Sequence, residues 1–219
     1  MQLQNLPLHR RDSIGSAYHV LTFEAEAPID ARAGQFAMVR AATWGDAPLL
    51  PRPMSFLTGG LRPSILIKVV GEGTRRMAHA SSGEPFTLLG PLGRPWSDCP
   101  EDHRPVYVAG GVGVAPLLFL ARERHERGGS LPRALSLYGA RTHGDLPLDS
   151  DLAAVSELRV ATEDGSRGVR GRVTVLLEQA LDEIAKSATN AKVYTCGPDA
   201  MMAAVARICE ARGVPCEVS

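Results

Sequence analysis

The chain has 219 residues, in which 24 lysine and arginine side chains balance 24 aspartate and glutamate side chains. This balance removes the broad positive surface that a nucleic-acid-binding protein needs. No apolar run approaches the roughly 20 residues of a membrane span and the first residues form no signal peptide, so we expect a cytoplasmic protein with no nucleic-acid or membrane partner.

The pattern up to about Leu89 predicts short β-strands separated by turns. We expect these strands at residues 6–10, 18–23, 35–40, 54–58, 64–70 and 85–89. About six short strands indicate a small closed antiparallel barrel. A short helix is expected to begin at Gly73 and Thr74 and to run to Ala80, with Thr74 as its N-terminal cap.

The segment 90–95, Gly-Pro-Leu-Gly-Arg-Pro, ends the strand pattern, and a charged stretch follows it. We place the domain boundary here, with a first domain over residues 1–100 and a second over 101–219. Strands then alternate with helices, which indicates a Rossmann-like α/β domain with a parallel sheet. The expected strands cover 106–109, 134–138, 158–162, 191–195 and 214–218, and the expected helices cover 116–127, 174–186 and 199–212. In the last helix we expect Asp199 as the N-cap and Gly213 at the C′ position.

A glycine-rich turn joins the first strand and the first helix of the second domain. The apolar run 106–109 ends in Gly110, Gly111 and Gly113, and Pro116 suits a first helical position, where its missing N–H costs nothing. Glycines let the backbone approach a ligand, and the N–H groups at a helix start favour a pyrophosphate. A proline replaces the third glycine of the dinucleotide fingerprint, so a tight turn of an ordinary α/β protein also explains the pattern.

Two segments of the first domain carry candidate anion-binding groups. In the stretch 51–56, Arg52 stands between two prolines, which restrict its backbone and allow its guanidinium to be aimed at a phosphate. The hydroxyl of Ser55 is expected on the same face of the strand as Arg52. In the stretch 67–74, a strand runs into Gly71 and Gly73 at a helix start, which is a second anion-binding feature. The alternatives are an edge strand with a surface arginine and an ordinary strand-to-helix turn.

A third strand end carries a thiol. The stretch 193–199 is a strand that ends in Cys196, Gly197 and Pro198. Ligands of open parallel sheets lie beyond the carboxyl ends of the strands, so Cys196 is expected near a bound dinucleotide. A buried structural cysteine is the competing interpretation. The four cysteines, at 99, 196, 209 and 216, are too far apart for paired metal-ligand spacing, and the six histidines form no ligand-spaced pair, so we expect no metal site.

These segments, taken in order, resemble the ferredoxin-NADP reductase superfamily, and within it the electron-transfer subunits of two-component (class 1B) dihydroorotate dehydrogenases. The resemblance covers nearly the whole chain. It rests on Arg-Pro-x-Ser at 52–55, Lys-Val-x-Gly-x-Gly-Thr at 68–74, Gly-Gly-x-Gly-x-Ala-Pro-Leu at 110–117, Thr-x-Asp-Gly-Ser at 162–166 and Cys-Gly-Pro at 196–198.

The resemblance implies FAD on the barrel, with Arg52 on its pyrophosphate and Ser55 near the flavin edge, and a nicotinamide dinucleotide on the glycine turn. Cys196 would face the point of hydride transfer and is the candidate catalytic residue. The residues expected at the cofactor sites are Arg52, Pro53, Met54, Ser55, Phe56, Lys68, Val69, Val70, Gly71, Gly73, Thr74, Gly110, Gly111, Val112, Gly113, Pro116, Arg141, Asp164, Gly197 and Pro198.

The implied function is that of an FAD-dependent electron-transfer subunit working between NAD(H) and an FMN-containing dihydroorotate dehydrogenase catalytic subunit in pyrimidine biosynthesis. Hydride would move between the nicotinamide and the flavin without an acid or base. Arg141 follows the second strand of the α/β domain and suits a 2′-phosphate, so NADP is not excluded, although NAD is favoured. The alternatives are a stand-alone NAD(P)H:flavin or acceptor oxidoreductase and a non-enzymatic scaffold.

The sequence differs from the pattern of this subunit family at its C-terminal end. Chains of this subunit family continue into a cysteine-rich module that binds a two-iron two-sulfur cluster through four thiolates. The sequence here ends at Ser219, and Cys216 alone cannot hold a cluster, so we expect no iron–sulfur cluster in this chain as given. A shortened form and a member that works without this relay remain equally open.

Overall fold

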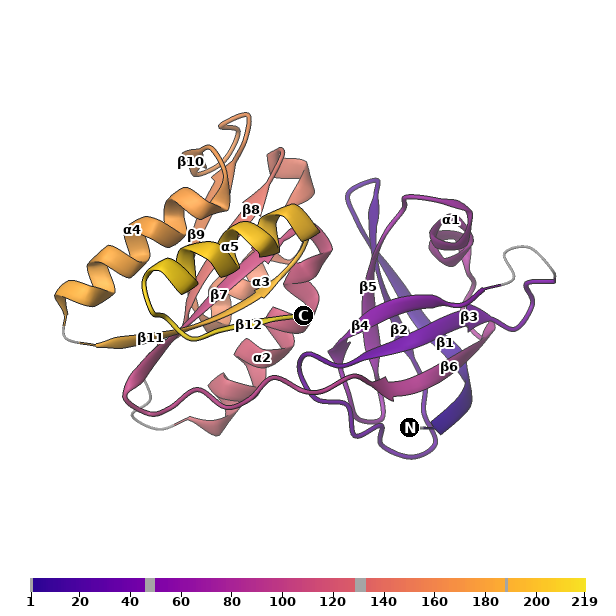
Figure 1. Ribbon diagram of the computed structural model, residues 1–219. Coiled ribbons are helices and arrows are strands. Elements are labelled where there is room, and N and C mark those ends of the chain that lie inside the picture. Colours follow the sequence, from indigo (N-terminus) through magenta and orange to yellow (C-terminus); the bar gives the residue numbers. More distant parts are fainter. Residues whose placement is uncertain (1, 46–49, 129–132, 188) are drawn as a thin grey trace. The chain divides into compact units, whose positions relative to one another are not determined.

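The computed structural model describes residues 2–45, 50–128, 133–187 and 189–219. The chain divides into two compact units, Met1–Pro95 and Trp96–Ser219, which Figure 1 colours from indigo to magenta and from magenta to yellow. The division lies after Pro95, whereas the composition of the sequence suggests a boundary after residue 100. Each unit has its own core and is described separately.

The first unit is a closed antiparallel barrel with the strand order β1-β2-β5-β4-β3-β6. Its elements are β1 (Gln2–Ile14), β2 (Tyr18–Phe23), β3 (Phe36–Ala41), β4 (Arg52–Thr58), β5 (Ser64–Lys68), α1 (Glu72–His79) and β6 (Pro85–Leu92). Alternation directs every second side chain inward, as in β3, where Ala37, Val39 and Ala41 are buried. Phe23 meets Phe86 edge to face in this interior. The predicted six-stranded barrel is confirmed.

The first strand is longer than the sequence suggests. β1 has 13 residues instead of the five expected at 6–10. Its first half pairs with β6 and its second half with β2, and the register shifts between Leu8 and Arg10. Only Leu6 and Leu8 are buried in this strand. The remaining side chains give no apolar periodicity from which the strand's full length could be predicted.

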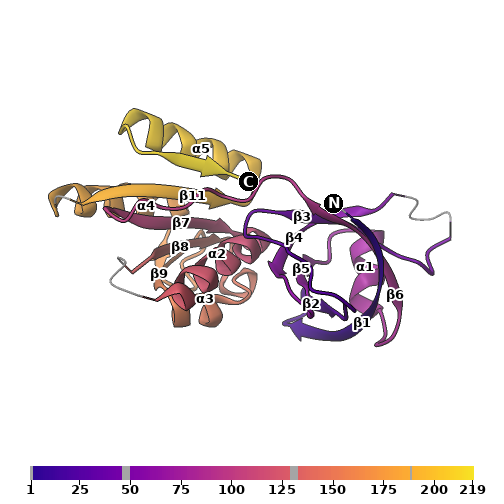
Figure 2. The same ribbon diagram turned by 90° about the horizontal axis from the view of Figure 1, so that it is seen from below.

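The second unit is a parallel sheet with the strand order β10-β9-β8-β7-β11-β12. Its elements are β7 (His103–Gly110), α2 (Val114–Arg127), β8 (Leu135–Ala140), α3 (Asp149–Val155), β9 (Glu157–Thr162), β10 (Val169–Arg170), α4 (Val173–Lys186), β11 (Asn190–Cys196), α5 (Asp199–Ala211) and β12 (Cys216–Val218). Figure 2 shows α2 and α3 on one face of the sheet and α4 and α5 on the other. The predicted α/β architecture is therefore confirmed.

The helix starts differ in detail from the sequence-based expectation. α2 begins at Val114 after a short 3₁₀ turn, so Pro116 is its third residue and not its first. The proline is still tolerated because the first-turn N–H groups lack helical partners. The N-cap of α5 is Pro198, which makes Asp199 the first helical residue. Gly213, with φ of 63°, lies just past the C-cap as expected.

An ion pair between the buried Lys192 and the partly exposed Glu217 fastens the segment after Pro95 to the sheet of the second unit. Lys192 is 8% exposed, and its Nζ lies 2.7 Å from Oε1 of Glu217. The backbone N–H of Ser97 donates to the same carboxylate at 3.0 Å, and the Tyr194 hydroxyl donates to the Ser97 carbonyl at 2.8 Å. Burial acts to raise the pKa of Glu217, but the hydrogen bonds from Lys192 and Ser97 outweigh it and hold that pKa below its ordinary value.

We expect Glu217→Gln to lower the free energy of unfolding by about 1.5–3 kcal/mol at neutral pH, because Lys192 is left buried without its counter-charge. The pKa of Glu217 is lower in the folded state than in the unfolded state. Its stabilisation is therefore present above the unfolded pKa of about 4.3 and is lost as pH falls through the folded value, so the two proteins should converge in acid.

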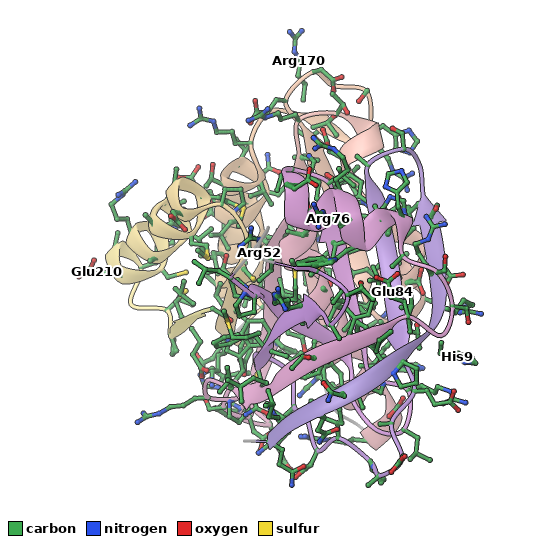
Figure 3. The ribbon with its side chains drawn as sticks, turned by 90° about the vertical axis from the view of Figure 1, so that its right-hand side faces the viewer. His9, Arg52, Arg76, Glu84, Arg170 and Glu210 are labelled. Carbon is green, nitrogen blue, oxygen red and sulfur yellow. The ribbon has the colours of Figure 1, made fainter. Side chains whose placement is uncertain are left out.

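Urea unfolding followed across pH measures this difference. Glu210→Gln is the matched control, because Glu210 extends from α5 into solvent (Figure 3). Equal losses for the two variants, or a difference that does not change with pH, would contradict the assignment.

Candidate functional site

In the second unit, the order in which the chain adds strands to the sheet reverses at β7. The chain passes from β7 to β8 on one side and later returns to β11 on the other. In parallel sheets such a switch point opens a crevice at the carboxyl ends of the two neighbouring strands, where ligands bind. The turns that follow these strands are 110–113 and 196–198. They contain the glycines and the thiol that the sequence identifies, and the fold brings them together.

Glycines allow the two turns to pack backbone against backbone. A Cβ atom on Gly113 would lie 2.1 Å from the carbonyl oxygen of Cys196. A Cβ on Gly110 would lie 2.7 Å from the Met201 sulfur, and one on Gly197 would lie 3.0 Å from the Gly110 Cα. Gly110 and Gly113 are therefore required by contacts within the protein, a role that their spacing in the sequence does not reveal.

Gly111 is the glycine of this turn that stays open. Its φ of +54° is in the left-handed region, and no atom lies within 4 Å of the position its Cβ would take. The neighbouring Val112 is 40% exposed. The Tyr138 hydroxyl donates to the Gly111 carbonyl at 2.9 Å and holds the turn in place. A ligand can thus approach the backbone at Gly111 and Val112.

Cys196 ends β11 beside this turn, directly after the buried Thr195. The Thr195 hydroxyl donates to the Val108 carbonyl at 3.0 Å, which fixes the end of β11 against β7. Burial raises the pKa of the Cys196 thiol to about 11. The thiol is therefore neutral at pH 7 and is not available as a thiolate nucleophile.

The loops after β8 and β9 form the continuation of the same sheet edge. The Asp164 N–H donates to the Arg141 carbonyl at 3.2 Å, so these two exposed candidates lie together. Backbone and side-chain hydrogen bonds from Ser166 lower the pKa of Asp164. The Ser166 hydroxyl in turn accepts a bond from the His143 N–H at 2.8 Å. Ser166 thus ties one loop to the other.

Arg52 lies across the start of α1 in the first unit, and Figure 3 labels it in β4. A Cβ on Gly73, the second residue of α1, would lie 2.8 Å from the Arg52 Nε. One guanidinium N–H donates to the Leu50 carbonyl at 3.1 Å. The expectation that Ser55 and Arg52 share one face of the strand is wrong, because Ser55 is three positions further along β4 and strand alternation places it on the opposite side. A full positive charge and a helix N-terminus therefore meet at Gly73.

The turn before α1 uses its polar groups internally. The Thr74 hydroxyl accepts from the N–H groups of Val70 and Gly71 at 2.9 and 3.2 Å, and donates to the Gly71 carbonyl at 3.1 Å. The Val69 N–H donates to the Ala17 carbonyl at 2.8 Å. The expectation that Thr74 caps the helix is wrong, because Gly71 is the N-cap and Thr74 is the third helical residue. Free donors come instead from the first-turn N–H groups of α1.

Three of the expected cofactor-binding residues serve packing. Phe56 is fully buried in the barrel core and Pro116 is buried in α2. The Lys68 ammonium lies over the Tyr18 ring, 5.0 Å from its centroid. Besides Arg52 and Lys68, the partly or fully exposed candidates of this unit are Pro53, Met54, Ser55, Val69, Val70 and Gly71.

The sequence gives no signal for Met201 or Tyr138. Met201 stands four residues after Gly197 and looks like any apolar helix residue, while Tyr138 looks like a core strand residue. Over the described ranges of the chain, no group of three or more His, Cys, Asp or Glu side chains is arranged to hold a metal ion. Within those same ranges, no helix has the length and apolar character needed to cross a bilayer.

The sequence is similar to a protein family and to curated relatives. The model of the "Oxidoreductase NAD-binding domain" family matches residues 107–207. A dihydroorotate dehydrogenase B (NAD(+)) electron transfer subunit from Geobacillus kaustophilus is 36% identical over 178 residues, which cover 79% of this chain and 65% of the relative. The subunit of the same name from Streptococcus pneumoniae strain R6 is 32% identical over 207 residues, covering 92% of this chain and 77% of the relative. The chain spans about two thirds of the length of the Geobacillus relative.

Solved structures share the two-unit fold. The ferredoxin reductase in carbazole 1,9a-dioxygenase superposes with a TM-score of 0.84 at 19% identity, covering 99% of this chain and 68% of that chain. The NADH-dependent reduced ferredoxin-NADP oxidoreductase gives a TM-score of 0.78 at 25% identity, with coverage of 98% and 75%. The cytochrome b5 reductase domain of Ulva prolifera nitrate reductase gives 0.78 at 16% identity, with coverage of 100% and 97%.

We expect Gly113→Ala to destabilise the protein by about 1–3 kcal/mol, because the new methyl group would overlap the backbone carbonyl of Cys196, which cannot rotate aside. Gly144→Ala is the control. Its nearest neighbour, the Thr142 hydroxyl, would be 3.7 Å away at an ordinary contact distance. Urea unfolding measures both variants, and an unchanged midpoint for Gly113→Ala would show that the turns are not packed as described.

Proposed function

Because the chain belongs to the family of dihydroorotate dehydrogenase B electron-transfer subunits, we propose that it is a flavin-dependent oxidoreductase that carries electrons between NAD(H) and a dihydroorotate dehydrogenase catalytic subunit in pyrimidine biosynthesis. FAD binds to the barrel unit and NAD to the α/β unit. The catalytic partner carries FMN. The similarity to electron-transfer subunits over 92% of this chain supports the proposal.

The observation that carries the flavin assignment is the contact between Arg52 and Gly73. The Arg52 guanidinium lies against the N-terminus of α1, so the charge of the arginine and the partial positive charge of the helix start are next to each other. Such an arrangement favours an anion between them, and the pyrophosphate of FAD has the required charge. Glycine at position 73 leaves room for the arginine, since a Cβ there would displace it.

The α/β unit presents groups suited to a nicotinamide dinucleotide. The open backbone at Gly111 and Val112 lies at the start of α2, where N–H groups favour a pyrophosphate. Arg141 and Asp164 lie further along the same sheet edge, where the adenosine half of a dinucleotide extends from this turn. We assign these four residues to NAD.

A flavin bound at Arg52 and the first turn of α1 would supply the redox chemistry, exchanging one hydride, and so two electrons, with the nicotinamide. The chain's own residues position the reactants. Arg52 and the first turn of α1 hold the phosphates of FAD. The closely packed turns at Gly110 and Gly197 fix the position of the backbone beside Cys196. The neutral Cys196 thiol offers a small contact surface that neither donates a charge nor competes for the hydride. No residue is required to move a proton.

Reconstitution tests the function. The purified chain, incubated with FAD, should become yellow and oxidise NADH with an artificial acceptor. Mixed with the dihydroorotate dehydrogenase catalytic subunit of the same organism, it should support dihydroorotate-dependent reduction of NAD⁺, which neither protein performs alone.

NADH oxidation without any coupling to that partner would instead identify a stand-alone NAD(P)H:acceptor oxidoreductase. A chain that stays colourless after incubation with FAD would overturn both functions.

We expect Arg52→Ala to weaken FAD binding by about 1.5–3 kcal/mol, or roughly 10- to 150-fold in Kd, because a charge-assisted phosphate contact is lost. Arg62→Ala is the control, since Arg62 is a barrel-surface arginine paired with Glu24 at 2.8 Å. Titration of the flavin-free proteins with FAD, followed by flavin fluorescence, gives both constants. Equal affinity for wild type and Arg52→Ala would remove Arg52 from the site.

A further inference from the structure

The loop between β9 and β10, residues 163–168, is folded back onto the strand it leaves. The Thr162 hydroxyl accepts a hydrogen bond from the Arg167 N–H at 3.0 Å and donates one to the Arg167 carbonyl at 2.9 Å. Gly168 has a φ of +68°, and a Cβ on it would lie 2.0 Å from the Val160 carbonyl oxygen. The backbone of Arg167 is therefore fixed beside the end of β9.

The Arg167 side chain joins this loop to the start of α3. Its Nη2 lies 2.7 Å from Oδ2 of Asp149, and its Nη1 donates a hydrogen bond to Nε2 of His143 at 3.1 Å. The Asp149 side chain is only 15% exposed, and its Oδ2 atom is buried. A buried carboxylate needs a counter-charge close by, which the Arg167 guanidinium supplies. The ion pair therefore fastens the loop to the first residue of α3.

Further hydrogen bonds fasten the same loop to the turn after β8. The His143 N–H donates to the Ser166 hydroxyl at 2.8 Å, and that hydroxyl donates to the Asp164 carboxylate at 2.7 Å. The Asp164 N–H donates to the Arg141 carbonyl at 3.2 Å. Arg141 and Asp164, which we assign to the dinucleotide, are thus positioned by the bonds that hold the loop.

The segment before α3 leads to the glycine turn at the other end of the site. Leu148 has a φ of 59° and is the one non-glycine residue of the described chain in which φ is positive, a conformation that is sparsely populated for leucine. It places Asp149 at the helix start. The Tyr138 hydroxyl lies 3.1 Å from the Pro147 carbonyl and shares its proton between this oxygen and the Gly111 carbonyl.

These contacts form a continuous path along the carboxyl edge of the sheet. The path runs from the turn at Gly111 through Tyr138 and the segment 147–149 to Arg167 and the loop 163–168. The first end is the place assigned to the pyrophosphate, and the last is the place assigned to the adenosine half. A ligand that spans both places binds more tightly when their spacing is set in advance, because less ordering is needed on binding.

We propose that Arg167 is a positioning residue for the ADP portion of the nicotinamide dinucleotide. Its ion pair with Asp149 holds the adenosine side of the site at a fixed place relative to the pyrophosphate side. The inference rests on the proposed function, which makes NAD the ligand of this unit. Asp149 is too deeply buried to contact a ligand, so any effect of Asp149 on binding passes through Arg167.

Binding of ADP-ribose to the full-length chain, measured by titration calorimetry, tests the proposal without flavin or hydride transfer. Arg167→Ala should weaken binding by about 5- to 30-fold, because the contact that holds the loop is lost. Asp149→Asn, which removes the charge and keeps the shape, should act in the same direction. The double variant should bind no more weakly than Arg167→Ala, since both changes break one contact. Arg167→Lys should recover most of the affinity, because an ammonium can still pair with Asp149.

Arg159→Ala is the matched control. Arg159 is on the same strand, β9, and pairs with Glu157 and Glu183 at 3.0 and 2.8 Å, but it makes no listed contact with the loop 163–168 and should leave ADP-ribose binding unchanged. Amide hydrogen exchange monitors the fold. In Arg167→Ala the loop 163–168 should exchange faster, while β7 and β11 should exchange as slowly as in the wild type.

Steady-state kinetics of the FAD-loaded protein separate positioning from catalysis. Arg167→Ala should raise the KM for NADH by a factor similar to the loss of ADP-ribose affinity and leave kcat unchanged. The reason is that the reacting nicotinamide is at the opposite end of the dinucleotide from the adenosine. A fall in kcat with an unchanged KM would contradict the assigned role.

The proposal is overturned if Arg167→Ala binds ADP-ribose as tightly as the wild type, or if the losses of the two single variants multiply in the double variant. Tighter binding by Asp149→Asn would also overturn it, because an arginine released from its carboxylate would then be a direct phosphate ligand. A wild-type chain that does not bind ADP-ribose overturns the NAD assignment as well, whereas normal wild-type binding with unaffected variants overturns the positioning role alone.

Discussion

The second unit depends on one close contact, in which the turn after β7 touches the turn after β11 with no side chain between them. The hypothetical Cβ of Gly113 falls on the Cys196 carbonyl, and that of Gly197 falls beside the Gly110 backbone. Protein interiors resist even small added volumes, so this contact tolerates only glycine. It fixes where α2 and α5 begin, and it leaves the backbone of the turn open at Gly111 and Val112.

The first unit offers an anion a charged side chain, where the second unit offers backbone N–H groups. Here a charged side chain, Arg52, lies against a helix start that carries roughly half a positive charge of its own. Such a pairing is unfavourable by itself, and Glu72 at the start of α1 is already engaged by Arg75 and Arg76. The barrel therefore supplies charge at its site, whereas the α/β unit supplies neutral backbone N–H groups. The two units suit the same chemical group, a pyrophosphate, by different means.

Sequence periodicity predicts the architecture of both units, but it does not predict the contacts that form the candidate site. The barrel strands and the alternating strands and helices follow from local patterns, and the structure contains both. α3 cannot be predicted from periodicity, because Leu152 is its only buried residue and leaves no apolar face to detect. The glycine turn could be located but not interpreted, because the partners of Gly110 and Gly113 are at 196–201, more than eighty residues away. The role of Thr74 is ambiguous in the sequence for a local reason, since a hydroxyl at the third helical position bonds to the preceding turn and resembles an N-cap.

The four cysteines show how environment, and not residue type, sets reactivity in this chain. Cys196 is next to the open turn, but burial without a hydrogen-bond donor keeps it a neutral thiol. Cys209, by contrast, is fully buried in the core of the second unit, and Cys216 is half-buried against the same core. Cys209 lies ten residues along α5 from Asp199, a rise of about 15 Å. Of the thiols at the two ends of this helix, only Cys196 therefore lies beside the open turn, and its neutral state follows from its burial there.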